Sequence, residues 1–128
     1  MLCRLATTLS FSFATLCLLC ACDADKEPVQ SYHVRGLVQD LSGSGADARV
    51  TIHHEAVARF KDRDGHASDM ASMKMIFGFG PKLSAADVKV GDKIAFDFDV
   101  RWSESPTLVV TRLQKLAPDV ALSLAGEP

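Results

Sequence analysis

Polar and apolar residues alternate most regularly along the segment from Lys93 to Trp102. Every second position of this segment is apolar: Ile94, Phe96, Phe98, Val100 and Trp102. Charged residues occupy most of the positions between them: Lys93, Asp97, Asp99 and Arg101. Because successive side chains of a β-strand point to opposite faces, this alternation predicts a strand with one buried face and one face in water.

Four further segments have the composition of strands and are separated by clusters of Gly, Asp, Ser and Pro. They are Tyr32–Leu41, Arg49–His54, Met73–Phe79 and Leu108–Leu116. Five strands are enough to close a small barrel, which removes the exposed edges that an open sheet would keep. The pattern therefore predicts an all-β fold, a small five-stranded OB-like β-barrel over residues 31–116. Residues 117–128 are expected to form a loose tail or a frayed helical turn without a function.

The first 21 residues have the pattern of a secretory signal peptide. Arg4 precedes an apolar run that ends in Leu19-Cys20-Ala21-Cys22. This ending resembles a bacterial lipobox, so we expect Cys22 to be the lipidated first residue of the mature chain, in a flexible tether over residues 22–30. An ordinary cleavage without lipid is the alternative. A membrane-spanning helix is less well supported, because the apolar run is near the lower length limit.

Removal of the signal would leave Cys22 as the one cysteine, and its acylation would exclude disulfides and thiolate metal sites. Of the 14 basic residues Arg4 would also leave, so 13 basic and 16 acidic side chains give a formal charge of −3. Nucleic-acid binding depends on neutralising phosphates, and this mildly acidic domain is not expected to bind DNA or RNA. The remaining length and an apolar fraction of 48% fit one globular domain.

Strand periodicity places a histidine and two methionines on the inward face, near one end of the predicted barrel. His54 is in phase with the apolar residues of its strand, whereas His53 points to the opposite face. Met73 and Met75 are in phase with the two phenylalanines that follow them, while Lys74 points away. One imidazole and two thioethers are therefore expected to converge.

A third methionine, Met70, lies in the loop that leads into the same strand, close enough to reach the same end of the barrel. Thioether sulfur is neutral and polarisable, so this donor set favours Cu(I) or Ag(I) over harder cations. Methionine also suits an oxidising compartment, because disulfide formation does not consume it. The alternative interpretation is that the methionines fill an irregular core and that the histidine is a hydrogen-bonded neighbour.

At these residues the chain resembles the CusF-like family of small periplasmic copper- and silver-binding proteins. The resemblance spans about Tyr32 to Lys115 and is carried by three segments together: Val50–His54, Met70–Phe77 and Val90–Phe98. It implies a five-stranded OB-like barrel in which His54, Met73 and Met75 bind the metal ion. Met70 stands where members of the family carry a tryptophan or a methionine, which makes it the expected fourth ligand.

The segment Arg59–Ser68 makes the link between His54 and the methionines longer than in that family. This segment either covers the site and adds His66 as a ligand, or forms an exposed turn around Asp64-Gly65, which turn chemistry favours. A lysine, Lys74, also replaces the small residue that is usual between the paired methionines.

The leading hypothesis is a periplasmic, membrane-anchored copper-binding lipoprotein that acts as a metallochaperone for copper efflux and homeostasis. It would act as a monomer and hand Cu(I) or Ag(I) to a copper efflux adaptor or another periplasmic copper protein. The second hypothesis is a metal-independent structural or protein-interaction domain on the same barrel. An enzyme is not expected, because no spacing of histidines, carboxylates and serines builds a nucleophile–base pair.

Overall fold

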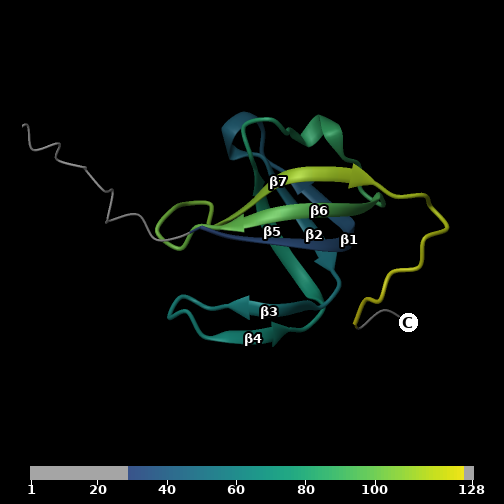
Figure 1. Cartoon of the computed structure of the whole chain (residues 1–128). Coiled ribbons are helices and arrows are strands. Elements are labelled where there is room, and N and C mark those ends of the chain that lie inside the picture. Colours follow the sequence, from purple (N-terminus) through teal and green to yellow (C-terminus); the bar gives the residue numbers. More distant parts are fainter. Residues whose placement is uncertain (1–28, 126–128) are drawn as a thin grey trace, which may run out of the picture.

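The computed structural model describes residues 29–125, so the predicted signal peptide and Cys22 lie outside the described residues. Five strands form a closed barrel in the order β1-β2-β5-β7-β6 (Figure 1). Their bounds are β1 (Gln30–Ser42), β2 (Arg49–His54), β5 (Met73–Phe79), β6 (Lys93–Val100) and β7 (Leu108–Lys115). Neighbouring strands are antiparallel except β5 and β7, which are parallel. This is the strand order of an OB-fold, so the predicted fold class is confirmed.

Within residues 29–125 the helical structure consists of two single-turn 3₁₀-helices, η1 (Gly45–Asp47) and η2 (Ala85–Asp87). The second begins at a capping box: the side chain of Ser84 accepts a backbone N–H of the first turn, and the carboxylate of Asp87 accepts the N–H of Ser84. No helix among these described residues has the length and apolar character needed to span a bilayer.

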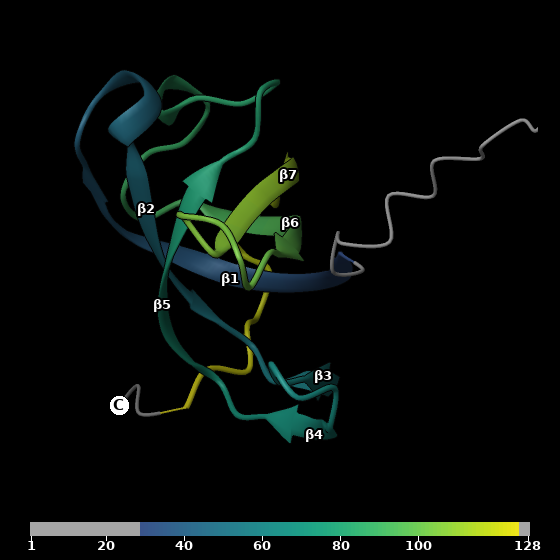
Figure 2. The same cartoon turned by 90° about the vertical axis from the view of Figure 1, so that its left-hand side faces the viewer.

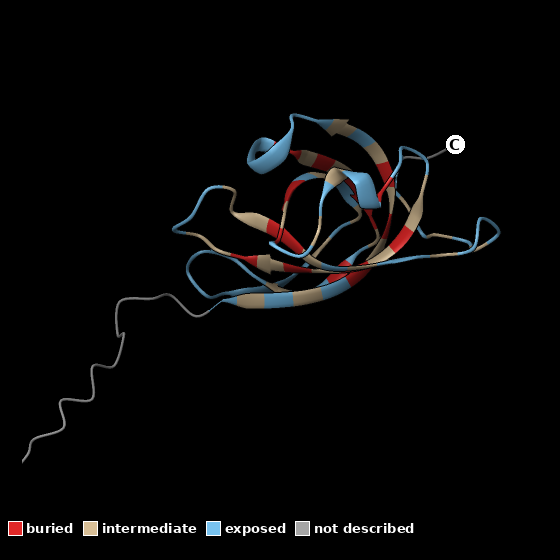
Figure 3. Ribbon diagram, turned by 90° about the horizontal axis from the view of Figure 1, so that it is seen from above, coloured by how far each residue is buried: buried red, intermediate tan, exposed pale blue. Residues whose placement is uncertain are grey.

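The hydrophobic core fills the interior of the barrel, where the buried positions are red in Figure 3. Strand β6 has the predicted alternation, because every second residue from Ile94 to Val100 is buried. Three phenylalanine rings meet at its centre, with Phe77 lying 5.4 Å from Phe96 and 5.2 Å from Phe98, edge towards face. The strand ends two residues before Trp102, which is half-buried.

Strand β1 approaches β2 very closely at Gly36, which pairs with His54. A Cβ atom at this glycine would lie 2.6 Å from Cγ2 of Ile52 and 2.9 Å from the carbonyl oxygen of His53. A larger residue would push β1 away from the strand that carries the predicted histidine ligand, so the missing side chain here sets the width of the barrel beside the candidate site.

A hairpin that was not expected from the sequence leaves the barrel between β2 and β5. Its strands β3 (Val57–Lys61) and β4 (Ala67–Met70) pair with each other in a separate sheet and lie below the barrel in Figures 1 and 2. Phe60 fastens the hairpin to the barrel, because its ring lies 5.1 Å from that of Tyr32 and 6.3 Å from that of Trp102. The long link is therefore a folded hairpin that packs against one end of the barrel.

Residues 117–125, here called the C-terminal strap, were expected to form a loose tail or a frayed helical turn. They begin with one turn, in which the N–H of Val120 donates to the carbonyl oxygen of Ala117 at 3.1 Å, and then continue without regular secondary structure. The strap leaves β7 and descends to the junction between the barrel and the hairpin (yellow in Figures 1 and 2). Lys93 Nζ donates to the carbonyl oxygens of Pro118 and Val120, each at 2.7 Å. Two backbone N–H groups further along the strap donate to side chains next to the predicted site.

Candidate metal centre

His54 is the last residue of β2 and is fully buried, with 0% of its surface exposed. Its Nδ1 lies 2.6 Å from the carbonyl oxygen of Glu55. A carbonyl oxygen can only accept a hydrogen bond, so Nδ1 carries the proton and Nε2 presents its lone pair. This Nε2 is buried and has no hydrogen-bond partner among residues 29–125. An orphaned nitrogen with its ring fixed from the other side is the arrangement that a metal-binding histidine adopts.

Burial is the main cause of a lowered pKa of His54, because it disfavours the charged imidazolium. The hydrogen bond to the Glu55 carbonyl acts in the opposite direction, and the neighbouring His53 adds a smaller lowering of the pKa. The imidazole is therefore neutral at neutral pH, which is the protonation state that a metal ligand requires.

The strand register places two predicted methionine ligands next to this histidine. Met73 pairs directly with His54 across the β2–β5 ladder, and Met75 pairs with Ile52, one step along the same face. Side chains opposite each other in an antiparallel pair are nearest neighbours, and diagonal ones remain within reach of long side chains. Met75 is half-buried against the core, whereas 40% of the surface of Met73 is exposed. The pair thus reaches from the core to solvent.

Met70 approaches from the hairpin and not from the barrel. It is the last residue of β4, pairs with the buried Val57, and is half-buried against the core. Two residues, Ala71 and Ser72, separate it from Met73 at the start of β5. The predicted donors therefore come from two structural parts, three from the barrel and one from the hairpin.

His66 does not join this set. It lies in the turn of the hairpin with 81% of its side chain exposed, and the turn is held by Asp62, whose Oδ1 accepts the N–H groups of Asp64 and His66. Gly65 in this turn has a φ of 83°, a conformation that favours glycine. The exposed turn predicted around Asp64-Gly65 is present, and Asp62, Asp64 and His66 form only an exposed cluster there.

Glu55 was not among the residues expected at this site, and its backbone carbonyl orients the His54 ring. Its carboxylate accepts hydrogen bonds from Arg35 at 2.7 and 3.0 Å and from the N–H of Ser123 at 2.7 Å. Burial by itself raises the pKa of Glu55, but the hydrogen bonds from Arg35 and Ser123 and the Arg35 charge lower the pKa overall. A backbone acceptor leaves no signal in the sequence. The one available signal was that an acidic residue, Glu55, directly follows the predicted ligand histidine.

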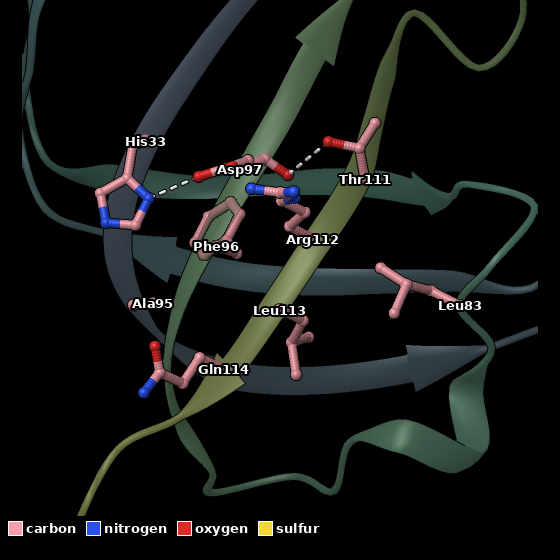
Figure 4. A pocket seen from close by; sticks show the side chains of 9 residues that line it. All are labelled: His33, Leu83, Ala95, Phe96, Asp97, Thr111, Arg112, Leu113 and Gln114. Atoms are coloured by element: carbon pink, nitrogen blue, oxygen red, sulfur yellow. Dashed lines mark hydrogen bonds and ion pairs between the residues drawn. The ribbon is translucent and has the colours of Figure 1, made fainter.

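A hollow of about 590 Å³ lies elsewhere, on the outer face of β1, β6 and β7 (Figure 4). His33 and Asp97 pair across its floor at 2.5 Å, and Arg112 and Gln114 line it from β7. It contains none of the four predicted ligands. Its lining mixes polar and charged residues with apolar ones such as Leu83 and Leu113 and contains no methionine, which distinguishes it from the thioether-rich end of the barrel.

No protein-family model matches this chain, and no curated protein does. Among solved structures, apo-CusF from Escherichia coli is 21% identical over 70% of this chain and 92% of that chain, with a TM-score of 0.49. CusF bound to Ag(I) from the same organism is 22% identical over 69% of this chain and 94% of that chain, with a TM-score of 0.48. The assignment to the OB-fold stands on the strand order and register described above, and the likeness to these two structures is one of fold.

Proposed function

We propose that this protein binds Cu(I) or Ag(I) through Nε2 of His54 and the sulfur atoms of Met70, Met73 and Met75. One observation carries the proposal: Nε2 of His54 is buried and orphaned, while its ring is fixed through Nδ1 and its cross-strand neighbour is a methionine. A buried acceptor without a partner costs about 1–3 kcal/mol, and a bound cation would remove this cost. The likeness of fold to CusF, known in an Ag(I)-bound form, is in keeping with this assignment.

The donor set favours this class of ion. Three thioethers and one neutral imidazole carry no charge, so they do not compensate the charge of Zn²⁺ or Ca²⁺, whereas soft monovalent d¹⁰ ions accept such ligands. The partial exposure of Met73 gives an arriving ion or an acceptor protein a first sulfur to contact. This suits a carrier that exchanges its cargo by ligand replacement better than a site that stores metal permanently.

The proposed role is a metallochaperone without enzymatic activity, acting in the periplasm as a monomer anchored to the membrane through a lipid on Cys22. Its proposed partners are a copper efflux adaptor or another periplasmic copper protein. The mildly acidic formal charge supports a protein partner over a nucleic acid.

The decisive experiment is a titration of the reduced protein with Cu(I) in competition with a chromogenic chelator. We expect one equivalent to bind, and the triple variant Met70→Leu, Met73→Leu, Met75→Leu to lose this binding while it keeps its β-sheet circular dichroism spectrum. If the wild-type protein binds no Cu(I) or Ag(I), the proposal is wrong and the metal-independent interaction domain becomes the leading hypothesis.

A further inference from the structure

The four predicted donors belong to two parts of the structure that are joined by short links. The β2–β5 ladder ends at the pair His54–Met73, and the β3–β4 ladder begins at the pair Val57–Met70. Residues 55–56 and 71–72, here called the hinge links, connect the two ladders. Together with the packing of Phe60 against Tyr32 and Trp102 at the far side of the hairpin, the conformation of these links therefore sets how Met70 lies relative to His54 and Met73.

The C-terminal strap makes one hydrogen bond to each hinge link. The N–H of Ser123 donates to Oε2 of Glu55 at 2.7 Å, and the N–H of Ala125 donates to Oγ of Ser72 at 2.9 Å. Glu55 directly follows His54, and Ser72 directly precedes Met73. Two bonds from one extended segment thus join the two positions at which the hairpin departs from the barrel.

The strap is itself anchored well before it reaches the links. Lys93, at the start of β6, donates to the carbonyl oxygens of Pro118 and Val120, and the N–H of Leu116 donates to the carbonyl oxygen of Lys93 at 2.8 Å. Beyond this anchor every second side chain is half-buried: Val120, Leu122 and Leu124. An extended chain with one apolar side packs along a surface, so the strap is held both by hydrogen bonds and by buried apolar area.

The carboxylate of Glu55 is the firmer of the two attachment points. Its side chain is 14% exposed and accepts hydrogen bonds from both Nε and Nη2 of Arg35. A backbone N–H that donates to such a fixed, ionised carboxylate forms a charge-assisted bond, which is stronger than a bond between neutral groups. Loss of the Ser123 N–H would therefore weaken the attachment more than loss of the Ala125 N–H.

We infer that the C-terminal strap is part of the metal centre: it ties the two hinge links together and so holds Met70 of the hairpin against His54, Met73 and Met75 of the barrel. Glu55 and Ser72 are the positioning residues through which it acts. This inference rests on the proposed function, because it assigns the strap to the same site. Without the strap the hairpin moves more freely, Met70 leaves the ion first, and the ion is released faster.

The test uses Ser123→Pro in the full-length protein, because proline removes the N–H donor without changing any predicted ligand. Ser123→Ala is the matched control, since it keeps the N–H. We expect Ser123→Pro to release Cu(I) to an excess of chelator about tenfold faster than wild type, as for the loss of one charge-assisted hydrogen bond. Ser123→Ala is expected to release it at the wild-type rate.

A double-mutant cycle with Met70→Leu shows whether the strap acts through Met70. If it does, Ser123→Pro changes the release rate by less than about twofold in the Met70→Leu background, because the contact that the strap protects is already absent. A general loosening of the barrel would give the same acceleration in both backgrounds, and that result would overturn the positioning role.

Amide hydrogen exchange of the metal-free protein provides a readout that does not depend on metal binding. We expect Ser123→Pro to raise exchange in residues 57–70 and to leave β6 and β7 unchanged. If Ser123→Pro releases Cu(I) at the wild-type rate and its hairpin amides exchange as in the wild type, the inference is overturned. Failure of the wild type to bind Cu(I) would overturn the proposed function, while the exchange data would still decide whether the strap holds the hairpin.

Should Ser123→Pro not fold, Ser72→Ala removes the other attachment point and is subjected to the same measurements.

Discussion

Replacing His54 by leucine distinguishes the effect of this residue on the stability of the metal-free protein from its effect on metal binding. In most cores the loss of a fully buried side chain lowers the free energy of unfolding by about 2–5 kcal/mol. At His54 the substitution removes an orphaned buried Nε2, which relieves about 1–3 kcal/mol, and one hydrogen bond from Nδ1 to the Glu55 carbonyl, which loses about 0.5–1.5 kcal/mol. The side-chain volumes are similar, so no large cavity is left. The metal-free His54→Leu variant should therefore be between about 0.5 kcal/mol less stable and 2.5 kcal/mol more stable than wild type.

The assay is a pair of thermal melts, with and without Ag(I), at neutral pH. An ion present at a hundred times its dissociation constant stabilises the wild type by about 2.7 kcal/mol, which raises the Tm of a domain of this size by about 10–20 °C. His54→Leu should show a metal-free Tm near or above that of wild type and lose most of the rise with Ag(I). A metal-free variant more than about 2 kcal/mol less stable than wild type, or an undiminished rise with Ag(I), would refute the account of the orphaned nitrogen.

Three further predictions concern the methionines, pH and anchoring. Met73→Leu and Met75→Leu each keep an apolar side chain of similar volume and should cost less than about 1.5 kcal/mol of stability, yet chelator competition should find markedly weaker Cu(I) binding, with the exposed Lys74→Ala as a control that binds normally. Burial lowers the pKa of His54 in the folded state, so the unfolded chain takes up a proton at this residue first as pH falls below about 6.5. The free energy of unfolding of the metal-free protein, measured by urea melts, should therefore fall from that pH downwards until the folded-state pKa is passed. The His54→Leu variant should lack this pH-dependent fall in stability. Cys22→Ser should release the protein from membranes in cell fractionation, and a wild-type chain without an acyl group in mass spectrometry would contradict the lipid anchor.

Strand periodicity predicted the barrel well because its strands bury one face and expose the other. The bounds of β2 and β5 agree with the predicted segments, and β6 ends two residues earlier than expected. His54 is buried and lies beside Met73, as the phase of the two strands predicts. These features depend on local alternation, which a single sequence carries.

The hairpin escaped prediction because its strands are short and lie mostly in solvent. In β3 and β4 the alternation is incomplete, the register shifts between Val57 and Phe60, and Arg59 adopts a φ of 55°. The strap escaped for a different reason: its contacts to Glu55 and Ser72 use backbone N–H groups, which every residue except proline offers. The alternation of Val120, Leu122 and Leu124 was a signal that the segment is extended.

The position of the ligands on β2 and β5 bears on the order in which the site can assemble. These strands are paired through the intervening hairpin, so the pair His54–Met73 closes a loop of fewer than twenty residues, whereas β1 must find β6 across some sixty residues. Short loops close at lower entropic cost and form earlier. The histidine and its first sulfur can therefore meet before the barrel closes, while the strap, which follows β7, can reach the hinge links only after β7 has joined the barrel. A folding chain would thus form the site without the strap before it forms the site with the strap bound to the hinge links.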